Sequence, residues 1–266
     1  MRTAALPIHA TRTLLTSTAL AVALAAAAAA SLPAQAMDWR HAFGGSVTGS
    51  GTIKSETRAV SGFSGVALSL DASVQIQQGA AEGVTVEADD NLLPLIETVV
   101  EGGILKIRPA TRNGSLSSRH LKIVVRAKTI DRLSIAGSGD IYAETLKTAK
   151  LNASIAGAGD LRIKSLDTDA LGVKIAGSGD FDAAGRAASL HASIAGSGDV
   201  KAARLEAKDV EVSIAGSGDA NVWARETLKV KVAGSGDVKY YGDAALQKSV
   251  VGSGEIKRLG AAPASP

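Results

Sequence analysis

A four-residue unit, Gly-Ser-Gly-Asp or a variant that differs at one position, occurs seven times in the second half of the chain. Consecutive copies are 20, 20, 19, 20, 18 and 18 residues apart, and their last residues are Asp140, Asp160, Asp180, Asp199, Asp219, Asp237 and Glu255. A constant period near 20 is typical of proteins that stack one supersecondary unit on copies of itself, because a single unit cannot bury its apolar face alone. The chain is therefore predicted to have a repeat architecture.

Apolar and polar residues alternate on both sides of each unit, as in Leu171, Val173 and Ile175 before the third copy. A period of two indicates β-strands with one buried and one exposed face. We expect each coil to contain two short strands joined at the Gly-Ser-Gly turn and a third, looser side. Such coils stack as an all-β, parallel β-solenoid with about 20 residues per coil, in which neighbouring backbones lie about 4.8 Å apart.

The glycines of the repeated unit are expected to form the corners of the coils, because glycine adopts backbone conformations that residues with a Cβ avoid. These structural turn residues are Gly137, Gly139, Gly157, Gly159, Gly177, Gly179, Gly196, Gly198, Gly216, Gly218, Gly234, Gly236, Gly252 and Gly254. The same argument predicts that valine at position 198 destabilises the fold more than a change at Ser197.

The first 36 residues have the features of a secretory signal peptide. Arg2 and Arg12 precede a run of small, apolar and hydroxyl residues at 14–30, and Ala34-Gln35-Ala36 fits the small-x-small cleavage pattern. Cleavage after Ala36 predicts an exported protein, located in the periplasm or on the cell surface of a bacterium. The alternative is an uncleaved membrane anchor, which needs roughly 20 strongly apolar residues, whereas alanine dominates this run. No later segment is apolar enough to cross a bilayer, so no membrane span is expected after cleavage.

The composition of the remaining 230 residues, 266 less 36, restricts the classes of partner. Loss of the two arginines lowers the formal net charge from +3 to +1, and no lysine or arginine run remains. Nucleic acid is therefore not an expected partner. The chain contains no cysteine, so burial and backbone hydrogen bonds must stabilise it without disulfides.

The order of segments predicts five parts, of which the signal peptide is the first. A stretch rich in glycine, serine and threonine, 37–57, is expected to be a flexible lead-in, and 261–266 a disordered tail. Residues 58–130 alternate like strands and are expected to form an N-terminal β region, which either adds coils or covers the end of the solenoid. One helical turn is expected within 89–96, with Asp89 or Asp90 as its cap. The solenoid repeats are expected to occupy 131–260.

Several further motifs precede the repeats in a fixed order. They are RAVSGFSGV at 58–66, VQIQQG at 74–79, VEADDNLL at 86–93 and ILKI at 104–107. Together with the Gly-Ser-Gly-Asp units, this order resembles the GIN-domain family, described as the head domain of auto-transporter adhesins, over about 58–260. The resemblance implies a right-handed parallel β-helix in bacterial envelope proteins, and it supplies no catalytic or ligand residues that could be assigned to positions of this chain.

The repeated acids are expected to form one row outside the core, because each precedes an inward residue. Two unit charges one coil apart repel by about 1 kcal/mol in water, so the row needs compensation. The amides of the acid's own turn can supply it, as can basic residues two positions further on: Arg162, Lys201, Lys239 and Lys257. The alternative is a row of calcium sites between turns, with Asp140, Asp160, Asp180, Asp199, Asp219 and Asp237 as candidates.

The sequence shows no singular cluster of catalytic groups. A polysaccharide-active enzyme needs two carboxylates at a set distance, or an acid-bound cation beside a base, whereas these acids are periodic and have similar neighbours. His41, His120 and His191 are isolated and lack metal-ligand spacing. We therefore expect a non-enzymatic cell-envelope scaffold without a cofactor, with a binding or adhesin-like role. A polysaccharide-active lyase or hydrolase and a calcium-binding repeat protein are the alternatives.

Three aromatic residues lie close together late in the repeats: Trp223, Tyr240 and Tyr241. They could form a sugar-stacking or subunit contact, or simply cover the last coils. The expected partner is an envelope protein or a glycan. The edges of a solenoid also permit self-association into a homo-oligomer.

Overall fold

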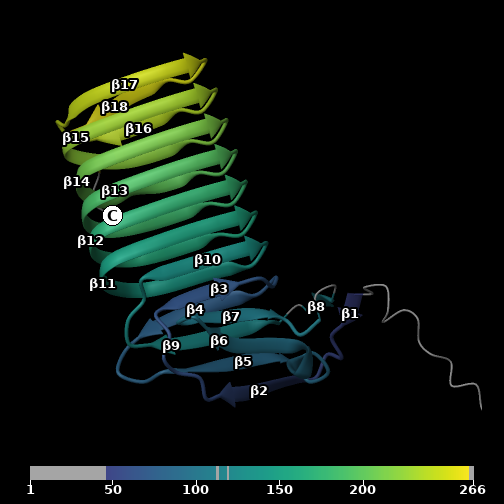
Figure 1. Ribbon diagram of the computed structural model, residues 1–266. Helices are drawn as coiled ribbons and strands as arrows, with labels where there is room; N and C mark the ends of the chain where they lie inside the picture. The colour runs from purple at the N-terminus through teal and green to yellow at the C-terminus, as the bar shows by residue number, and fades with distance from the viewer. Residues whose placement is uncertain (1–45, 112–113, 119, 264–266) are drawn as a thin grey trace, which may run out of the picture. The chain divides into compact units, whose positions relative to one another are not determined.

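Parallel strands stacked in register build the part of the chain that carries the repeats (Figure 1). The computed structural model describes residues 46–111, 114–118 and 120–263. The signal peptide, the first part of the lead-in and the last three residues of the tail lie outside these ranges. The described residues are nearly all β, as the alternation predicts, and the fold is a β-solenoid.

The long strands of the solenoid each run around most of one coil. They are β11 (Asp140–Gly157), β12 (Leu161–Gly177), β13 (Phe181–Gly196), β14 (Val200–Gly216) and β15 (Ala220–Gly234). The stack begins at β10 (Arg132–Gly137) and ends at β16 (Val238–Tyr241), β17 (Ala245–Gly252) and β18 (Ile256–Gly260). Between β11 and β12 the pairing runs from Ile141 with Leu161 to Gly157 with Gly177, so one period of the sequence is one coil.

The shorter periods of the sequence are absorbed on the third side of the coil. The 19-residue coil of β13 causes register shifts against both neighbours, after Ile163 in the β12–β13 pair and after Asp182 in the β13–β14 pair. The 18-residue coil of β15 causes shifts after Ala202 and Ala207 in the β14–β15 pair. Gly177 nevertheless pairs with Gly196, and Gly196 with Gly216. The corners therefore stay aligned through all the coils, while the opposite side accommodates the missing residues.

The core is a column of aliphatic side chains enclosed by the coils. The alternating residues on both sides of each corner point inward, and Phe181 is among the largest fully buried side chains. Those before the third to fifth corners are Leu171, Val173, Ile175, Leu190, Ala192, Ile194, Val210, Val212 and Ile214, each no more than 3% exposed. Burial of this column is the main stabilising contribution that a solenoid without disulfides can have.

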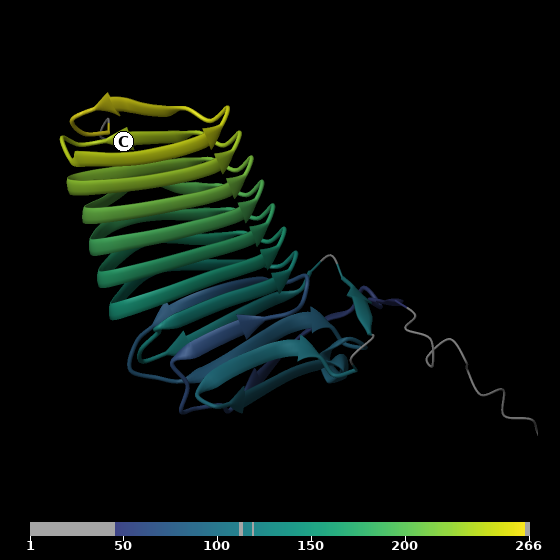
Figure 2. The ribbon, with the colours of Figure 1, turned by 45° about the horizontal axis from the view of Figure 1, so that its top comes forward.

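The region before the repeats adds two coils, whose order in the stack differs from their order in the sequence. β3 (Gly65–Leu68) and β4 (Ser73–Gln78) pair with β10 and β11. On their other side they pair with β7 (Ile104–Pro109) and β9 (Lys122–Ala127), also in parallel. The coil of residues 65–78 therefore lies between a coil formed by 104–127 and the first repeat (Figure 2).

Antiparallel strands close this end of the solenoid. β6 (Ile96–Glu101) pairs with β7, β5 (Gly83–Asp89) pairs with β9, and β2 (Ile53–Arg58) pairs with β5, all antiparallel. Two short strands, β1 (Ser46–Thr48) and β8 (Ser115–Ser117), pair with each other. Residues 58–130 thus contain both further coils and an end cover.

Two details of the N-terminal region differ from the sequence-based expectation. In the lead-in, 37–57, β1 and most of β2 are strands, and the side chains of β2 are almost all exposed. The sequence of β2 has no apolar alternation, because neither face of the strand is buried. Backbone pairing with β5 holds β2 in the sheet. The helical turn lies where expected, as the 3₁₀ turn η2 (Leu93–Leu95), but Leu92 is its N-cap and no side chain caps it.

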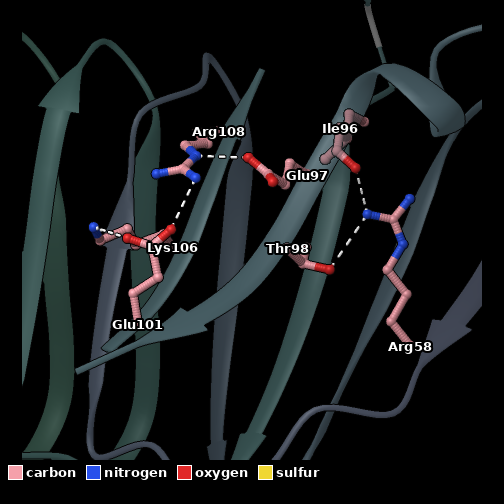
Figure 3. Close-up of polar contacts among 7 residues, drawn as sticks. All are labelled: Arg58, Ile96, Glu97, Thr98, Glu101, Lys106 and Arg108. Atoms are coloured by element: carbon pink, nitrogen blue, oxygen red, sulfur yellow. Dashed lines mark hydrogen bonds and ion pairs between the residues drawn. The ribbon is translucent and has the colours of Figure 1, made fainter. Parts of the chain in front are cut away.

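Arg58, at the end of β2, forms hydrogen bonds with β6 and η2. Its guanidinium donates hydrogen bonds to the carbonyl oxygens of Ile96 and Leu93, the latter at 2.8 Å. A longer bond of 3.3 Å joins it to the hydroxyl of Thr98 (Figure 3). One side chain at the end of β2 therefore satisfies carbonyl groups of both β6 and η2.

Candidate functional site

The aspartate row is a ladder of hydrogen bonds between coils. Oδ1 of Asp140 accepts the backbone N–H of Asp160 at 2.9 Å, and Oδ1 of Asp160 accepts that of Asp180 at 3.2 Å. The same bond recurs at 2.8 to 3.0 Å along Asp180, Asp199, Asp219, Asp237 and Glu255. Each aspartate of the row thus satisfies an amide of the next coil, whereas turn chemistry predicts the amides of the acid's own turn.

Cations beside the row occupy the second carboxylate oxygen in two coils. Arg162 lies 3.0 Å from Oδ2 of Asp160, and Lys201 lies 2.5 Å from Oδ2 of Asp180. The hydrogen bond to Asp180 raises the pKa of Lys201 above its ordinary value. Lys239 and Lys257 follow in the same outward column, but in the described part of the chain neither forms an ion pair with the row.

The calcium candidates have one oxygen committed to the ladder. A calcium ion takes six to eight oxygen ligands, whereas each coil offers one acid to this row. Within residues 46–111, 114–118 and 120–263, no three histidine, cysteine, aspartate or glutamate side chains gather closely enough to hold a metal ion. Calcium binding by Asp140, Asp160, Asp180, Asp199, Asp219 and Asp237 stays a prediction.

From Gly139 onward, the corner glycines leave no space for a side chain, whereas Gly137 has open space and is favoured by its φ of +120°. A Cβ at Gly157, where φ is +134°, would lie 2.3 Å from the carbonyl oxygen of Gly137. A Cβ at the second glycine of that unit, Gly159, would lie 2.0 Å from the carbonyl oxygen of Gly139. Real Cβ atoms do not approach backbone so closely, so the stacking distance itself demands glycine at both positions.

The late aromatic residues divide between the core and the surface. Tyr240 points inward and is 8% exposed, so it covers the last coils. Trp223 and Tyr241 point outward, are half-buried, and occupy equivalent positions on neighbouring strands. Only two of the three residues are therefore available to a ligand.

Tyr241 borders a hollow of about 330 Å³ on the outer surface after the corner. Its other lining residues are Asp182, Lys201, Ala203, Arg204, Asn221 and Leu259. Arg204 and Asp182 form an ion pair at 3.5 Å. An aromatic ring beside charged and amide groups can bind a polar ligand such as a sugar.

Sequence reasoning did not single out Asp182, Arg204 or Asn221. Asp182 and Asn221 occupy the outward column two positions after the corner acid, so the alternation itself could have indicated them. Arg204 lies after a register shift, and its approach to Asp182 depends on that irregularity. The histidines remain apart: His191 is exposed, with Nδ1 at 3.4 Å from Glu211, His120 is exposed, and His41 lies outside the described residues.

The family described as "Putative auto-transporter adhesin, head GIN domain" matches residues 62–244. The chain belongs to this family. The motifs before and within the repeats thus indicate the correct family. The β-solenoid that the resemblance implies is also the fold of this GIN domain.

Solved structures similar to this GIN domain have the same fold. A putative adhesin from Bacteroides fragilis is 26% identical, with a TM-score of 0.76, over 80% of this chain and 100% of that one. A putative lipid binding protein from Parabacteroides distasonis is 27% identical, with a TM-score of 0.70, over 80% of this chain and 99% of that one. A comparison with curated proteins gives no match. No helix in the described residues is both long and apolar enough to span a membrane.

Proposed function

We propose that this GIN domain is an exported, non-enzymatic scaffold of a bacterial envelope, which binds a partner through the outer faces of its solenoid. The observation that carries the proposal is the aspartate ladder, because it commits the most abundant acids of the repeats to backbone amides instead of to a reacting group. Family membership supports an adhesin-like role, and the leader sequence supports export.

A polysaccharide-active enzyme is the alternative, and the hollow beside Tyr241 is the place to consider for it. Asp182, Lys201 and Arg204 converge there from neighbouring coils. A lysine that acts as a general base must first lose its own proton near the working pH. Asp180 raises the pKa of Lys201 and so keeps this lysine protonated. Arg204 is permanently charged and pairs with Asp182. The arrangement favours holding polar groups over transferring protons.

The experiment measures binding and turnover on the same samples. Purified protein is incubated with a panel of envelope and plant polysaccharides and with lipid vesicles, the latter because a similar structure is described as lipid binding. Retention by at least one surface, without reducing ends or unsaturated products, is expected. Release of such products from any glycan, abolished by Asp182→Asn, would establish the enzyme instead.

A further inference from the structure

A second hollow lies on the other flat side of the coils, before the corner. We call this side the pre-corner face; it consists of the outward residues at the ends of β10 to β15 and in β17. The hollow has a volume of about 320 Å³, and its polar side chains are basic, amide and hydroxyl groups: Arg132, Ser134, Asn152, Ser154, Lys174 and His191. Ala153, Gly172 and Val173 complete the lining. No carboxylate lines it, whereas the hollow beside Tyr241 contains Asp182.

Gly172 creates the hollow. It lies in a column of outward residues between Asn152 and His191. From β10 to β17 every other member of the column has a side chain: Arg132, Asn152, His191, Glu211, Lys229 and Gln247. A Cβ at Gly172 would meet its nearest neighbour, Oδ1 of Asn152, at 3.3 Å, and the backbone there has no positive φ. Unlike the corner glycines, Gly172 is not required by the backbone, and its effect is to leave one side-chain space open.

The positive charge of the pre-corner face is uncompensated at this hollow. Glu211 is the acid of the face, and it lies 3.6 Å from Lys229, 4.0 Å from Lys231 and 3.4 Å from His191. Among the described residues, no carboxylate lies within ion-pair distance of Arg132 or Lys174. Two permanent cations without partners, beside an open space with amide and hydroxyl groups, form a binding environment for an anion.

We infer that this hollow binds the anionic group of an acidic polysaccharide, a ligand class that rests on the proposed binding function. The side chains of the face around it are small, with alanine or serine at most outward positions next to the corner. An extended polysaccharide chain can therefore lie across the coils. The alanines next to the corner are Ala136, Ala156, Ala176, Ala195, Ala215 and Ala233. Lys229 and Lys231 lie three coils beyond Lys174, about 14 Å away at 4.8 Å per coil, but both lie beside Glu211. The hollow is therefore where the anionic group of the polysaccharide chain is expected to bind.

The composition of the face argues against two other polyanions. Single-stranded nucleic acid binds on aromatic rings that stack with its bases, and membrane surfaces are bound through exposed aromatic and long aliphatic side chains. The outward positions of β10 to β15 before the corner contain neither. Val251 in β17 is 72% exposed, but it lies four coils beyond Gly172 and its hollow.

The test is titration calorimetry of the purified protein with polygalacturonate, with neutral dextran and with anionic phosphatidylglycerol vesicles. Gly172→Gln fills the hollow without changing charge, and the double variant Arg132→Gln/Lys174→Gln removes the two cations. Lys239→Gln is the matched control, since it removes an exposed cation from the other side of the corner. We expect polygalacturonate to bind, each hollow variant to weaken binding at least tenfold, Lys239→Gln to change it less than twofold, and dextran not to bind.

Three results would overturn the inference: no binding of polygalacturonate, binding by Gly172→Gln equal to that of the original protein, or an equal loss in Lys239→Gln. Binding of the vesicles alone would replace the polysaccharide with a membrane. Thermal melting checks that each variant is folded. If Gly172→Gln does not fold, Gly172→Ala is a milder variant that partly fills the same hollow. Cleavage of polygalacturonate would contradict the proposed function, whereas intact binding that ignores the hollow contradicts only this inference.

Discussion

At the scale of single residues, the corner glycines and serines differ sharply in what they can tolerate. A Cβ at Gly198 would lie 2.2 Å from the carbonyl oxygen of Gly179, whereas Ser197 is exposed. We expect Gly198→Val to lower the free energy of unfolding by about 3 kcal/mol or more, because the stacked backbones must separate. Ser197→Ala should change it by less than about 0.5 kcal/mol. Urea denaturation of both variants measures the difference, and equal stabilities would show that the coils are not stacked as described.

The residue scale also shows what a sequence can predict. The corner glycines, the outward acids and the inward aliphatics follow directly from the period and the alternation, and the structure places them accordingly. The partner of each aspartate in the row is a backbone amide one coil away, whereas turn chemistry points to the amides of its own turn. The hollow at Gly172 was not predicted, because its significance depends on which side chains flank it in the adjacent coils.

At the scale of elements, Asp89 links three segments at the end of β5. It is buried, and its carboxylate accepts hydrogen bonds from the amide of Gly51 at 2.7 Å and the hydroxyl of Ser118 at 2.6 Å. These bonds, that from Ser118 first, lower the pKa of Asp89 from its ordinary value of 3.8. Because the folded state binds the proton less tightly than the unfolded state, the contribution of Asp89 to stability is present above that ordinary pKa and is lost as the pH falls below it.

The corresponding prediction compares Asp89→Asn with the original protein across pH. We expect the variant to melt a few degrees lower at pH 7, with the difference shrinking as the pH falls from 5 to below 3 and the original carboxylate takes up its proton. Differential scanning calorimetry at several pH values measures this. A difference that is constant across this range would mean that the charge of Asp89 does not contribute.

The elements that sequence analysis could not place are those whose partners are distant in the chain. The alternation identifies β3 and β4 as strands. It does not predict their position between the first repeat and the coil of 104–127, because that position depends on pairing with strands distant in the sequence. Alternation reports which face is buried and not which strand lies beside it. β2 was missed for a related reason, since an exposed edge strand has no apolar face to detect.

At the scale of the whole solenoid, each coil contacts mainly its neighbours, so stability should be close to a sum over coils. Deleting residues 161–180 removes one complete coil and joins Asp160 to Phe181, which occupies the same position in its coil as Leu161. We expect the shortened protein to fold and to melt only a few degrees lower.

Deletion of residues 161–170 is the control, because removal of half a coil keeps the alternation of inward and outward residues but displaces the next corner by half a coil from the corners of the neighbouring coils. Circular dichroism and thermal melting compare the two deletions. If the half-coil deletion folds as well as the full-coil deletion, corner alignment is not what specifies the stack.

Because the coils share one corner and one register, the length of the solenoid depends on the number of repeat units. Each unit gained or lost moves the last coil by about 4.8 Å relative to the closed end, without a new interface having to evolve. Duplication of one short stretch of gene can thus lengthen the faces that the coils offer to a partner.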